Sequence, residues 1–338
     1  MKISQMKQRF NKIYSLCLIV TLLSLLVPSS ALAQMPIFEA DVTNEETFTV
    51  IPSASGIANF NNHFYIIGDD SPFLFQLNSK YELINKIKIS STKELHNGRL
   101  PKKIKPDFES ITIVPWGNDR DLLVFGSGGK EKQKIMVRID FDDSKPNVVK
   151  YSLDKFYQHL VKESKGTGKL NIEGAGYWKN NLILLNRADN TLFKIDLDSF
   201  KKYLKDKDND KPKVKPVKYT LPTNNGMPAR FSGATILPDE DLLVFTASIE
   251  NDPNWIVNES IIGSYLGVID LNQLENDVPV CKEIMKNNTP IQEKVESVYV
   301  LSKTDTLIKV VGVIDNDNGS SKLIEIEFKK SPIRNKSE

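Results

Sequence analysis

Five oxygen-bearing side chains recur along the sequence at similar intervals, and each is followed by glycine or serine. They are separated by 54, 64, 59 and 64 residues, and they are Ser55, Glu109, Glu173, Ser232 and Glu296. Carboxylate and hydroxyl oxygens are hard ligands, which suit calcium better than zinc or copper. The three histidines lie far apart with no neighbouring ligand at zinc spacing. If the fold brings the five residues together, the sequence predicts a calcium site.

Each of these residues opens a repeat of short strands. A strongly apolar strand follows, then a loop of glycine, asparagine and acids, then a third strand, all with apolar residues at period two between turn residues. The second strands are expected at 64–67, 121–125, 181–185, 241–245 and 306–313, and the third at 73–77, 135–140, 191–197, 265–271 and 322–328. A fourth strand fits after the first four repeats, at 83–89, 147–152, 214–221 and 278–284.

Five four-stranded sheets around a central channel form a β-propeller. The fifth repeat lacks a fourth strand, whereas 46–51 is an unassigned strand ahead of the first repeat. The sequence therefore predicts an all-β, five-bladed β-propeller in which 46–51 pairs with 322–328 and closes the last blade. An irregular pair of β-sandwiches is the alternative. Helical spacing of apolar residues predicts helices at 153–164 and 198–207.

In a propeller the first strand of each blade lines the channel and the second strand returns antiparallel. The five opening residues should then encircle one mouth, with the loops near Asp69, Gly126, Asn186, Ser248 and Asp315 on the same face. Three carboxylates close together raise one another's pKa, so protons or a cation must balance them. Alternatively, each glutamate hydrogen-bonds to a neighbouring blade in a purely structural belt.

The motifs resemble those of the calcium-activated nucleotidase (apyrase) family, secreted five-bladed propellers that hydrolyse nucleoside di- or triphosphates. The likeness lies in 55–58 with 64–70, 108–110 with 126–131, 172–175 with 186–187, 230–233 with 248–250, and 295–297. It implies that Ser55, Glu109, Glu173, Ser232 and Glu296 hold a central calcium ion. The chain departs from the family at 69–72, which read Asp-Asp-Ser-Pro, at Ile172 in place of a histidine, and at Arg187, which is followed by alanine instead of a second arginine. The family's segment upstream of the first blade has no match in 34–49.

Two alternative functions are consistent with the predicted propeller and its calcium site. The first is a calcium-dependent phosphohydrolase that acts on a small phosphorylated molecule, a phosphoanhydride or a phosphoester. Its catalytic candidates are Asp69, Asp70 and Arg187, and its substrate-binding candidates are Lys130, Arg230 and Glu250. Loop ion pairs and turn caps are the ordinary alternative for each of them. The second function is a non-catalytic ligand-binding or scaffolding propeller with a purely structural central ion.

The first 33 residues have the pattern of an export signal. Four basic residues and no acid precede an apolar stretch at 16–27, and Ala31-Leu32-Ala33 is a small-residue cleavage site. We expect residues 34–330 to form a single propeller domain, with a tail at 331–338, in an exported protein that is periplasmic or secreted. No later apolar run approaches the roughly 20 residues of a membrane span, so we expect no stable membrane insertion.

The charge balance excludes one class of partner. The chain has 45 basic and 43 acidic residues, and the signal segment contains four of the basic ones. Loss of that segment would leave 41 bases against 43 acids. A near-neutral chain has no electrostatic basis for binding a nucleic-acid polymer. We therefore expect a small-molecule ligand.

Overall fold

A computed structural model describes residues 37–331 apart from 118, 142–144, 207–210, 252–260 and 276–277. One compact unit covers Phe38–Lys330. The export signal predicted at 1–33 and residues 332–338 lie outside the described residues. No helix in the described ranges has the length and apolar content required to cross a bilayer.

Three sheets have four antiparallel strands each, in chain order. The first comprises β2 (Ala54–Phe60), β3 (His63–Gly68), β4 (Phe73–Leu77) and β5 (Leu83–Lys88). The second comprises β6 (Phe108–Trp116), β7 (Asp119–Gly126), β8 (Ile135–Asp140) and β9 (Asn147–Ser152). The third comprises β10 (Ile172–Trp178), β11 (Asn181–Asn186), β12 (Thr191–Asp196) and β13 (Val214–Lys218).

A nine-stranded sheet contains the rest of the main strands, in the order β16-β17-β18-β19-β1-β23-β22-β21, with β20 (Thr289–Pro290) paired to β19. Its first half is β16 (Arg230–Leu237), β17 (Leu242–Glu250), β18 (Ile261–Asp270) and β19 (Val280–Lys286). Its second half is β21 (Val295–Lys303), β22 (Leu307–Asp315) and β23 (Ser321–Ser331), and β1 (Ile37–Phe48) joins the halves. A two-stranded ribbon, β14 (Thr223–Asn224) with β15 (Met227–Pro228), precedes β16.

The N-terminal strand lies beside β23, as predicted, but the bounds expected for it were wrong. β1 covers Ile37–Phe48 instead of 46–51, and it also pairs in parallel with β19. Phe38, Ala40 and Val42 alternate into a hydrophobic cluster with Phe328, and the Phe38 and Phe328 rings stack at 5.0 Å. This buried alternation extends the strand toward the N-terminus. Residues 49–51 form a bend that leads to β2.

Two helices lie in connections next to the third sheet, one between β9 and β10 and the other between β12 and β13. α2 (Asp154–Ser164) buries Phe156, Tyr157 and Leu160 against the second and third sheets, and α3 (Leu197–Lys205) packs beside it through Phe200. Asp196 caps α3 by accepting a hydrogen bond from the Ser199 backbone N–H at 2.8 Å. Both helices lie where the apolar spacing predicted them. The short 3-10 helices η1 (Glu131–Gln133) and η2 (Pro238–Glu240) complete the elements.

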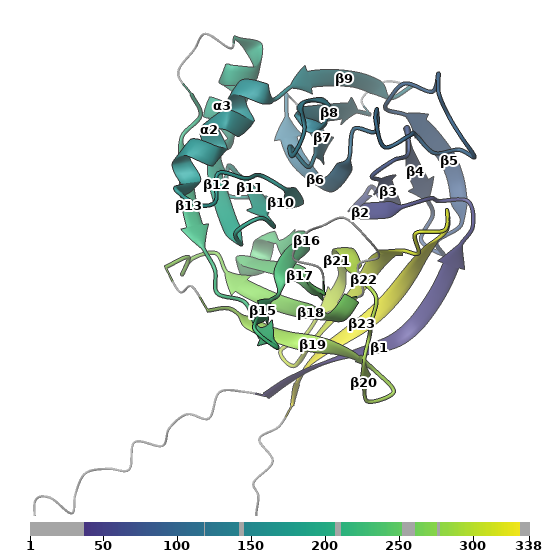
Figure 1. Ribbon diagram of the computed structural model, residues 1–338, viewed down its shortest axis with the longest axis vertical. Helices are drawn as coiled ribbons and strands as arrows, with labels where there is room; N and C mark the ends of the chain where they lie inside the picture. Colours follow the sequence, from purple (N-terminus) through teal and green to yellow (C-terminus); the bar gives the residue numbers. More distant parts are fainter. Residues whose placement is uncertain are drawn as a thin grey trace, which may run out of the picture. The chain divides into compact units, whose positions relative to one another are not determined.

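The first strand of each strand group lies nearest the middle of the arrangement in Figure 1. β2 contacts β6 and β21, β6 contacts β10, β10 contacts β16, and β16 contacts β21. The core lies between neighbouring sheets, because both faces of most strands are apolar. The described chain is therefore an all-β, propeller-like fold, and its five inner strands meet around one centre.

Candidate functional site

Each of the five inner strands has a register shift near its start. The pairing with the second strand is regular on both sides of one residue, which has no partner directly opposite it. That residue is Ser55 in β2, Glu109 in β6, Glu173 in β10, Ser232 in β16 and Glu296 in β21. A β-bulge re-aims the side chain of the extra residue and is common next to functional sites. The five residues singled out in the sequence thus share one backbone feature.

The three bulged glutamates converge. One carboxylate oxygen of each lies within 4.8 Å of those of the other two, for Glu109, Glu173 and Glu296. The Glu173 side chain is buried, whereas the other two are half-buried. The structure therefore brings together the three carboxylates that the repeat predicts at one mouth of the channel.

The two bulged serines contact the backbone instead. The Ser55 hydroxyl donates a hydrogen bond to the Phe108 carbonyl, and the Ser232 hydroxyl donates one to the Val295 carbonyl at 2.7 Å. Those carbonyls belong to the residues directly before Glu109 and Glu296. Each serine therefore fixes the peptide that precedes a bulged glutamate of the next inner strand.

Lys294 is a cation in this group that the sequence analysis missed. Its ammonium lies 2.7 Å from a Glu296 carboxylate oxygen and 3.3 Å from one of Glu173. Glu173 also accepts a hydrogen bond from the Asn171 amide at 2.7 Å. Lys294 and Asn171 each lie two residues before a bulged glutamate, and a polar side chain at that position in every repeat was the available signal.

Arg187, predicted as a catalytic residue, has protein partners on several sides. Its side chain is 1% exposed and forms ion pairs with Glu250 and, at 3.8 Å, with Glu173. It also donates to the Ser248 hydroxyl and to the Phe231 carbonyl, each at 3.2 Å. Arg187 therefore joins β10 to β17.

The other predicted phosphate partners lie in two places. The Arg230 guanidinium donates hydrogen bonds to the backbone carbonyls of Arg187 at 3.4 Å and Ala188 at 2.7 Å. Lys130 is exposed on the loop before η1, and its backbone N–H donates to the Gln133 side chain at 2.7 Å. The catalytic and substrate-binding roles expected for these residues stay predictions.

Asp69 and Asp70 lie on the loop after β3 and have separate cationic partners. Lys105 forms ion pairs with Asp69 and, at 2.7 Å, with Asp107, whereas Arg99 lies 2.7 Å from Asp70. Oxygens of Asp69, Asp107 and Glu109 also lie within 4.8 Å of one another. Glu109 therefore belongs to two groups of three carboxylates. Among the described residues, it has no ion pair.

The electrostatics follow from burial and like charge. Burial, with the negative charges of Asp107 and Glu173, raises the pKa of Glu109 well above its usual range. Burial raises the pKa of Glu296 to about 8, although the Lys294 charge opposes the rise. Burial disfavours the charge of Lys294, but the two glutamates outweigh it and hold its pKa well above normal. Nearby cations therefore do not fully balance the negative charge of these carboxylates, and least of all that of Glu109.

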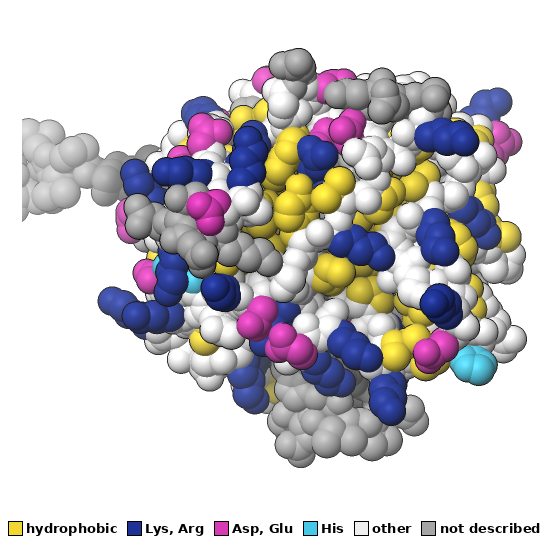
Figure 2. Space-filling view, turned by 90° about the horizontal axis from the view of Figure 1, so that it is seen from above, with side chains coloured by type: hydrophobic (Ala, Val, Ile, Leu, Met, Phe, Trp, Pro, Cys, Tyr) yellow, Lys and Arg dark blue, Asp and Glu magenta, His cyan; other side chains and the backbone are white. Residues whose placement is uncertain are grey.

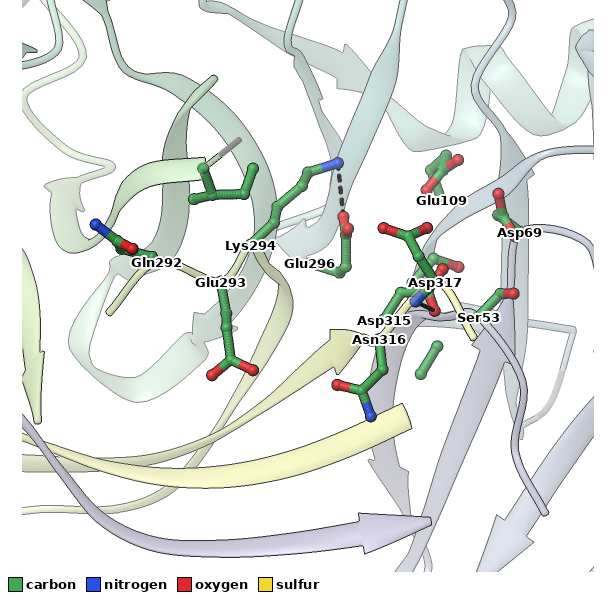
Figure 3. A pocket seen from close by; sticks show the side chains of 13 residues that line it. Ser53, Asp69, Glu109, Gln292, Glu293, Lys294, Glu296, Asp315, Asn316 and Asp317 are labelled. Carbon is green, nitrogen blue, oxygen red and sulfur yellow. Dashed lines mark hydrogen bonds and ion pairs between the residues drawn. The ribbon is translucent and has the colours of Figure 1, made fainter. Parts of the chain in front are cut away.

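A cavity of about 490 Å³ opens over this group (Figure 3). Six carboxylate side chains and one amine are among the residues that line it. The lining residues are Ser53, Ala54, Ser55, Asp69, Glu109, Ile261, Gln292, Glu293, Lys294, Glu296, Asp315, Asn316 and Asp317. Figure 3 shows the Lys294 ammonium turned toward Glu296. Lys130 and Arg230 do not line this cavity.

A family model described as a family of unknown function (DUF6929) matches residues 50–328. The chain belongs to this family. A search of curated proteins finds no match to the sequence. The family model therefore identifies the chain without assigning an activity, and it does not support the apyrase resemblance, which stays a prediction.

Three solved structures resemble the fold at low identity. Glutaminyl cyclase of Myxococcus xanthus has a TM-score of 0.49 at 11% identity, over 87% of this chain and 98% of that one. The PQQ-bound aldose sugar dehydrogenase of Streptomyces coelicolor has 0.45 at 11%, over 87% and 100%. Virginiamycin B lyase of Staphylococcus aureus has 0.40 at 12%, over 86% and 99%.

Proposed function

We propose that this protein is a five-bladed β-propeller that binds one calcium ion on its axis. The observation that carries the proposal is the convergence of three glutamates, each on a bulge near the start of an inner strand. Such bulges are a means of aiming side chains at a common point. Glu109, Glu173 and Glu296 are the residues that would hold the ion.

The hydrophobic clusters support the blade count. The group β21–β23 shares one cluster with β16–β19, which includes Val244 and Val298. It shares another with β2–β4, which includes Ile57 and Val311. Propeller blades pack face to face in a closed cycle and leave only short edges. In this interpretation the nine-stranded sheet is two blades whose outer edges are joined by β1.

The charges of the group favour a divalent cation. When ionised, the three bulged glutamates and Glu250 contribute four negative charges, against two positive charges from Lys294 and Arg187. One dication would bring the sum to zero and so reduce the cost of burying the carboxylates. Of these four carboxylates, Glu109 is the one without an ion pair among the described residues, so the positive charge of the dication would stabilise it most.

The donor atoms favour calcium over softer metals. The three bulged glutamates offer only oxygen, and carboxylate oxygens are typical calcium ligands. The hydroxyl protons of Ser55 and Ser232 are used by backbone carbonyls. In the proposal these serines position the bulged glutamates, and their direct or water-mediated ligation stays a prediction.

The same charges favour binding over phosphate hydrolysis. A phosphoryl group requires cationic partners for its oxygens. Arg187 and Arg230 donate to carboxylates and backbone carbonyls, and Lys294 is the one Lys or Arg side chain lining the cavity in the described part of the chain. The function we propose is therefore ligand binding by a calcium-containing propeller, in preference to calcium-dependent hydrolysis of phosphoanhydrides or phosphoesters.

Thermal melting with and without calcium tests the proposed ion. Calcium should raise the melting temperature of the calcium-free protein by about 4 °C when free calcium is about 100 times the dissociation constant. Glu173→Gln should reduce this response, because an amide replaces a carboxylate ligand. Glu131→Gln, at the exposed start of η1, should leave it intact. Identical melting of the unmodified protein in chelator and in millimolar calcium would contradict the proposal.

Export is part of the same proposal. The basic segment, apolar stretch and Ala31-Leu32-Ala33 site at the N-terminus are typical of a cleaved signal. Extracytoplasmic calcium is abundant enough for a site of moderate affinity, because extracellular modules bind it with dissociation constants of about 0.1–1 mM. N-terminal sequencing of the protein recovered from outside the cytoplasm should begin at Gln34.

A further inference from the structure

Lys294 differs from most lysines of this chain, because its ammonium lies among the bulged glutamates. Most described lysines are exposed, and Figure 2 shows Lys and Arg side chains spread over one side of the molecule. The Lys294 side chain is 20% exposed, and its ammonium lies 2.7 Å from an oxygen of Glu296 and 3.3 Å from one of Glu173. Lys294 is therefore a counter-ion for two of the three carboxylates that would hold calcium.

The two oxygens of the Glu173 carboxylate have different partners. Oε1 accepts a hydrogen bond from the Asn171 amide at 2.7 Å and lies 3.8 Å from the buried Arg187 guanidinium. Oε2 accepts a hydrogen bond from the Lys294 ammonium, which is its one partner among the described residues. An ion shared with the other bulged glutamates would therefore reach Glu173 most easily through Oε2. Calcium and the Lys294 ammonium would then need the same oxygen.

The Lys294 side chain also has space into which it can move. It lines the cavity of about 490 Å³, and Figure 3 shows it extended toward Glu296. A lysine ammonium is a compact charge on a flexible four-carbon stem. Rotation about the side-chain bonds could move the ammonium from the carboxylates into the cavity with the backbone unchanged. Its charge would remain beside a cavity that Asp315 and Asp317 also line.

We infer that Lys294 is a tethered counter-ion that competes with calcium for Glu173 and Glu296 and thereby sets the calcium affinity of the site. The inference rests on the proposed calcium function and adds its regulation. In the calcium-free protein the ammonium balances two carboxylates and stabilises the ring. A dication attracts the same carboxylates more strongly than one ammonium does, so calcium at sufficient concentration displaces Lys294 into the cavity.

Calcium titration of Lys294→Met by isothermal calorimetry tests the inference. Methionine keeps an unbranched side chain and removes the charge, so the variant should bind calcium about tenfold or more tightly than the unmodified protein. Its melting temperature in chelator should change in the opposite sense and fall, because Glu173 and Glu296 lose their counter-ion. A lysine with a merely structural role would lower the melting temperature without tightening calcium binding.

Lys322→Met is the matched control. The Lys322 side chain is 17% exposed, and its ammonium lies 2.6 Å from an oxygen of Glu293, which also lines the cavity. The substitution removes the same charge from a lysine of similar exposure that has no bulged glutamate as a partner. Calcium affinity should stay within about threefold of that of the unmodified protein.

The outcomes separate this inference from the calcium proposal. Calcium binding by the unmodified protein with equal or lower affinity in Lys294→Met would overturn the competition and leave the calcium site standing. Equal tightening in Lys322→Met would also overturn it, because the effect would then be one of net charge. No calcium binding by either the unmodified protein or Lys294→Met would contradict the calcium proposal itself, and this inference with it.

Reductive methylation of the unmodified protein provides a test that needs no folded variant. Mass spectrometry should find Lys294 methylated faster in millimolar calcium than in chelator, because the displaced ammonium no longer pairs with Glu173 and Glu296. The rate at Lys322 should be the same in both conditions. An unchanged rate at Lys294 in a protein that binds calcium would overturn the inference.

Discussion

Arg187 shows, at the scale of single residues, how the centre of the fold balances its charges. The guanidinium is fully buried and bridges Glu173 on β10 to Glu250 on β17. Burial disfavours its charge, but the two carboxylates keep its pKa above the usual value. Removal of one partner from a buried ion pair is costly, because the remaining charge is left uncompensated. Arg187 therefore stabilises the ring whatever ligand the cavity takes.

Arg187→Leu should lower the free energy of unfolding by about 3 kcal/mol or more, measured by urea denaturation. The substitution removes the ion pair between Arg187 and Glu250 and the hydrogen bonds from Arg187 to the Ser248 hydroxyl and the Phe231 carbonyl. Arg120→Leu, at an exposed position, is the control and should change the value by no more than about 0.5 kcal/mol. A cost for Arg187→Leu as small as that of the control would mean that the carboxylates are balanced without it.

The positions of the bulged glutamates could be predicted from the repeat, and the pairing of each amine with a particular carboxylate could not. Glu109, Glu173 and Glu296 repeat in register, so the repeat alone indicated that they would meet. Lys294 also lies in register, two residues before Glu296, but Lys105 reaches Asp69 from a loop outside the repeat. Which amine neutralises which carboxylate depends on side-chain conformations and packing, which a strand pattern does not specify.

At the scale of elements, local alternation predicted most strands to within a few residues. β4 (Phe73–Leu77) and β8 (Ile135–Asp140) have the predicted bounds. β1 was placed beside the correct strand with incorrect bounds, because its pairing depends on distant neighbours. Ala40 lies opposite Ile284 in the parallel pairing with β19, and no local pattern encodes a contact between residues so far apart in the sequence.

Deletion of residues 37–48 should destabilise the fold, and deletion of 332–338 should not. Loss of β1 exposes Phe328 and Ile284 and leaves β19 and β23 as open edges. We expect the free energy of unfolding to fall by about 2 kcal/mol or more, with increased aggregation. Urea denaturation with light scattering measures both. Equal tolerance of the two deletions would show that β1 does not join the two halves of the nine-stranded sheet.

At the scale of the whole molecule, the balance of charge differs between the chain and its centre. The chain has nearly equal numbers of basic and acidic residues, yet six carboxylates line one cavity with a single amine. The repeat predicted that acids would meet at one mouth. It did not predict the extent of the cavity, because Ser53 and Asp317 lie on loops whose conformations depend on the packed sheets. We propose that one calcium ion at the bulged glutamates offsets part of this excess of negative charge.

Calcium content after equilibrium dialysis tests that claim most directly. The folded protein, dialysed against micromolar to millimolar calcium and measured by elemental analysis, should bind about one ion per chain in a saturable way. Glu109→Gln should abolish this binding at the same concentrations, and Asp305→Asn should not alter it. Saturation near one ion per chain that disappears in Glu109→Gln is the predicted result. No saturable calcium in the folded protein, or binding unchanged in Glu109→Gln, would contradict a calcium ion at the bulged glutamates.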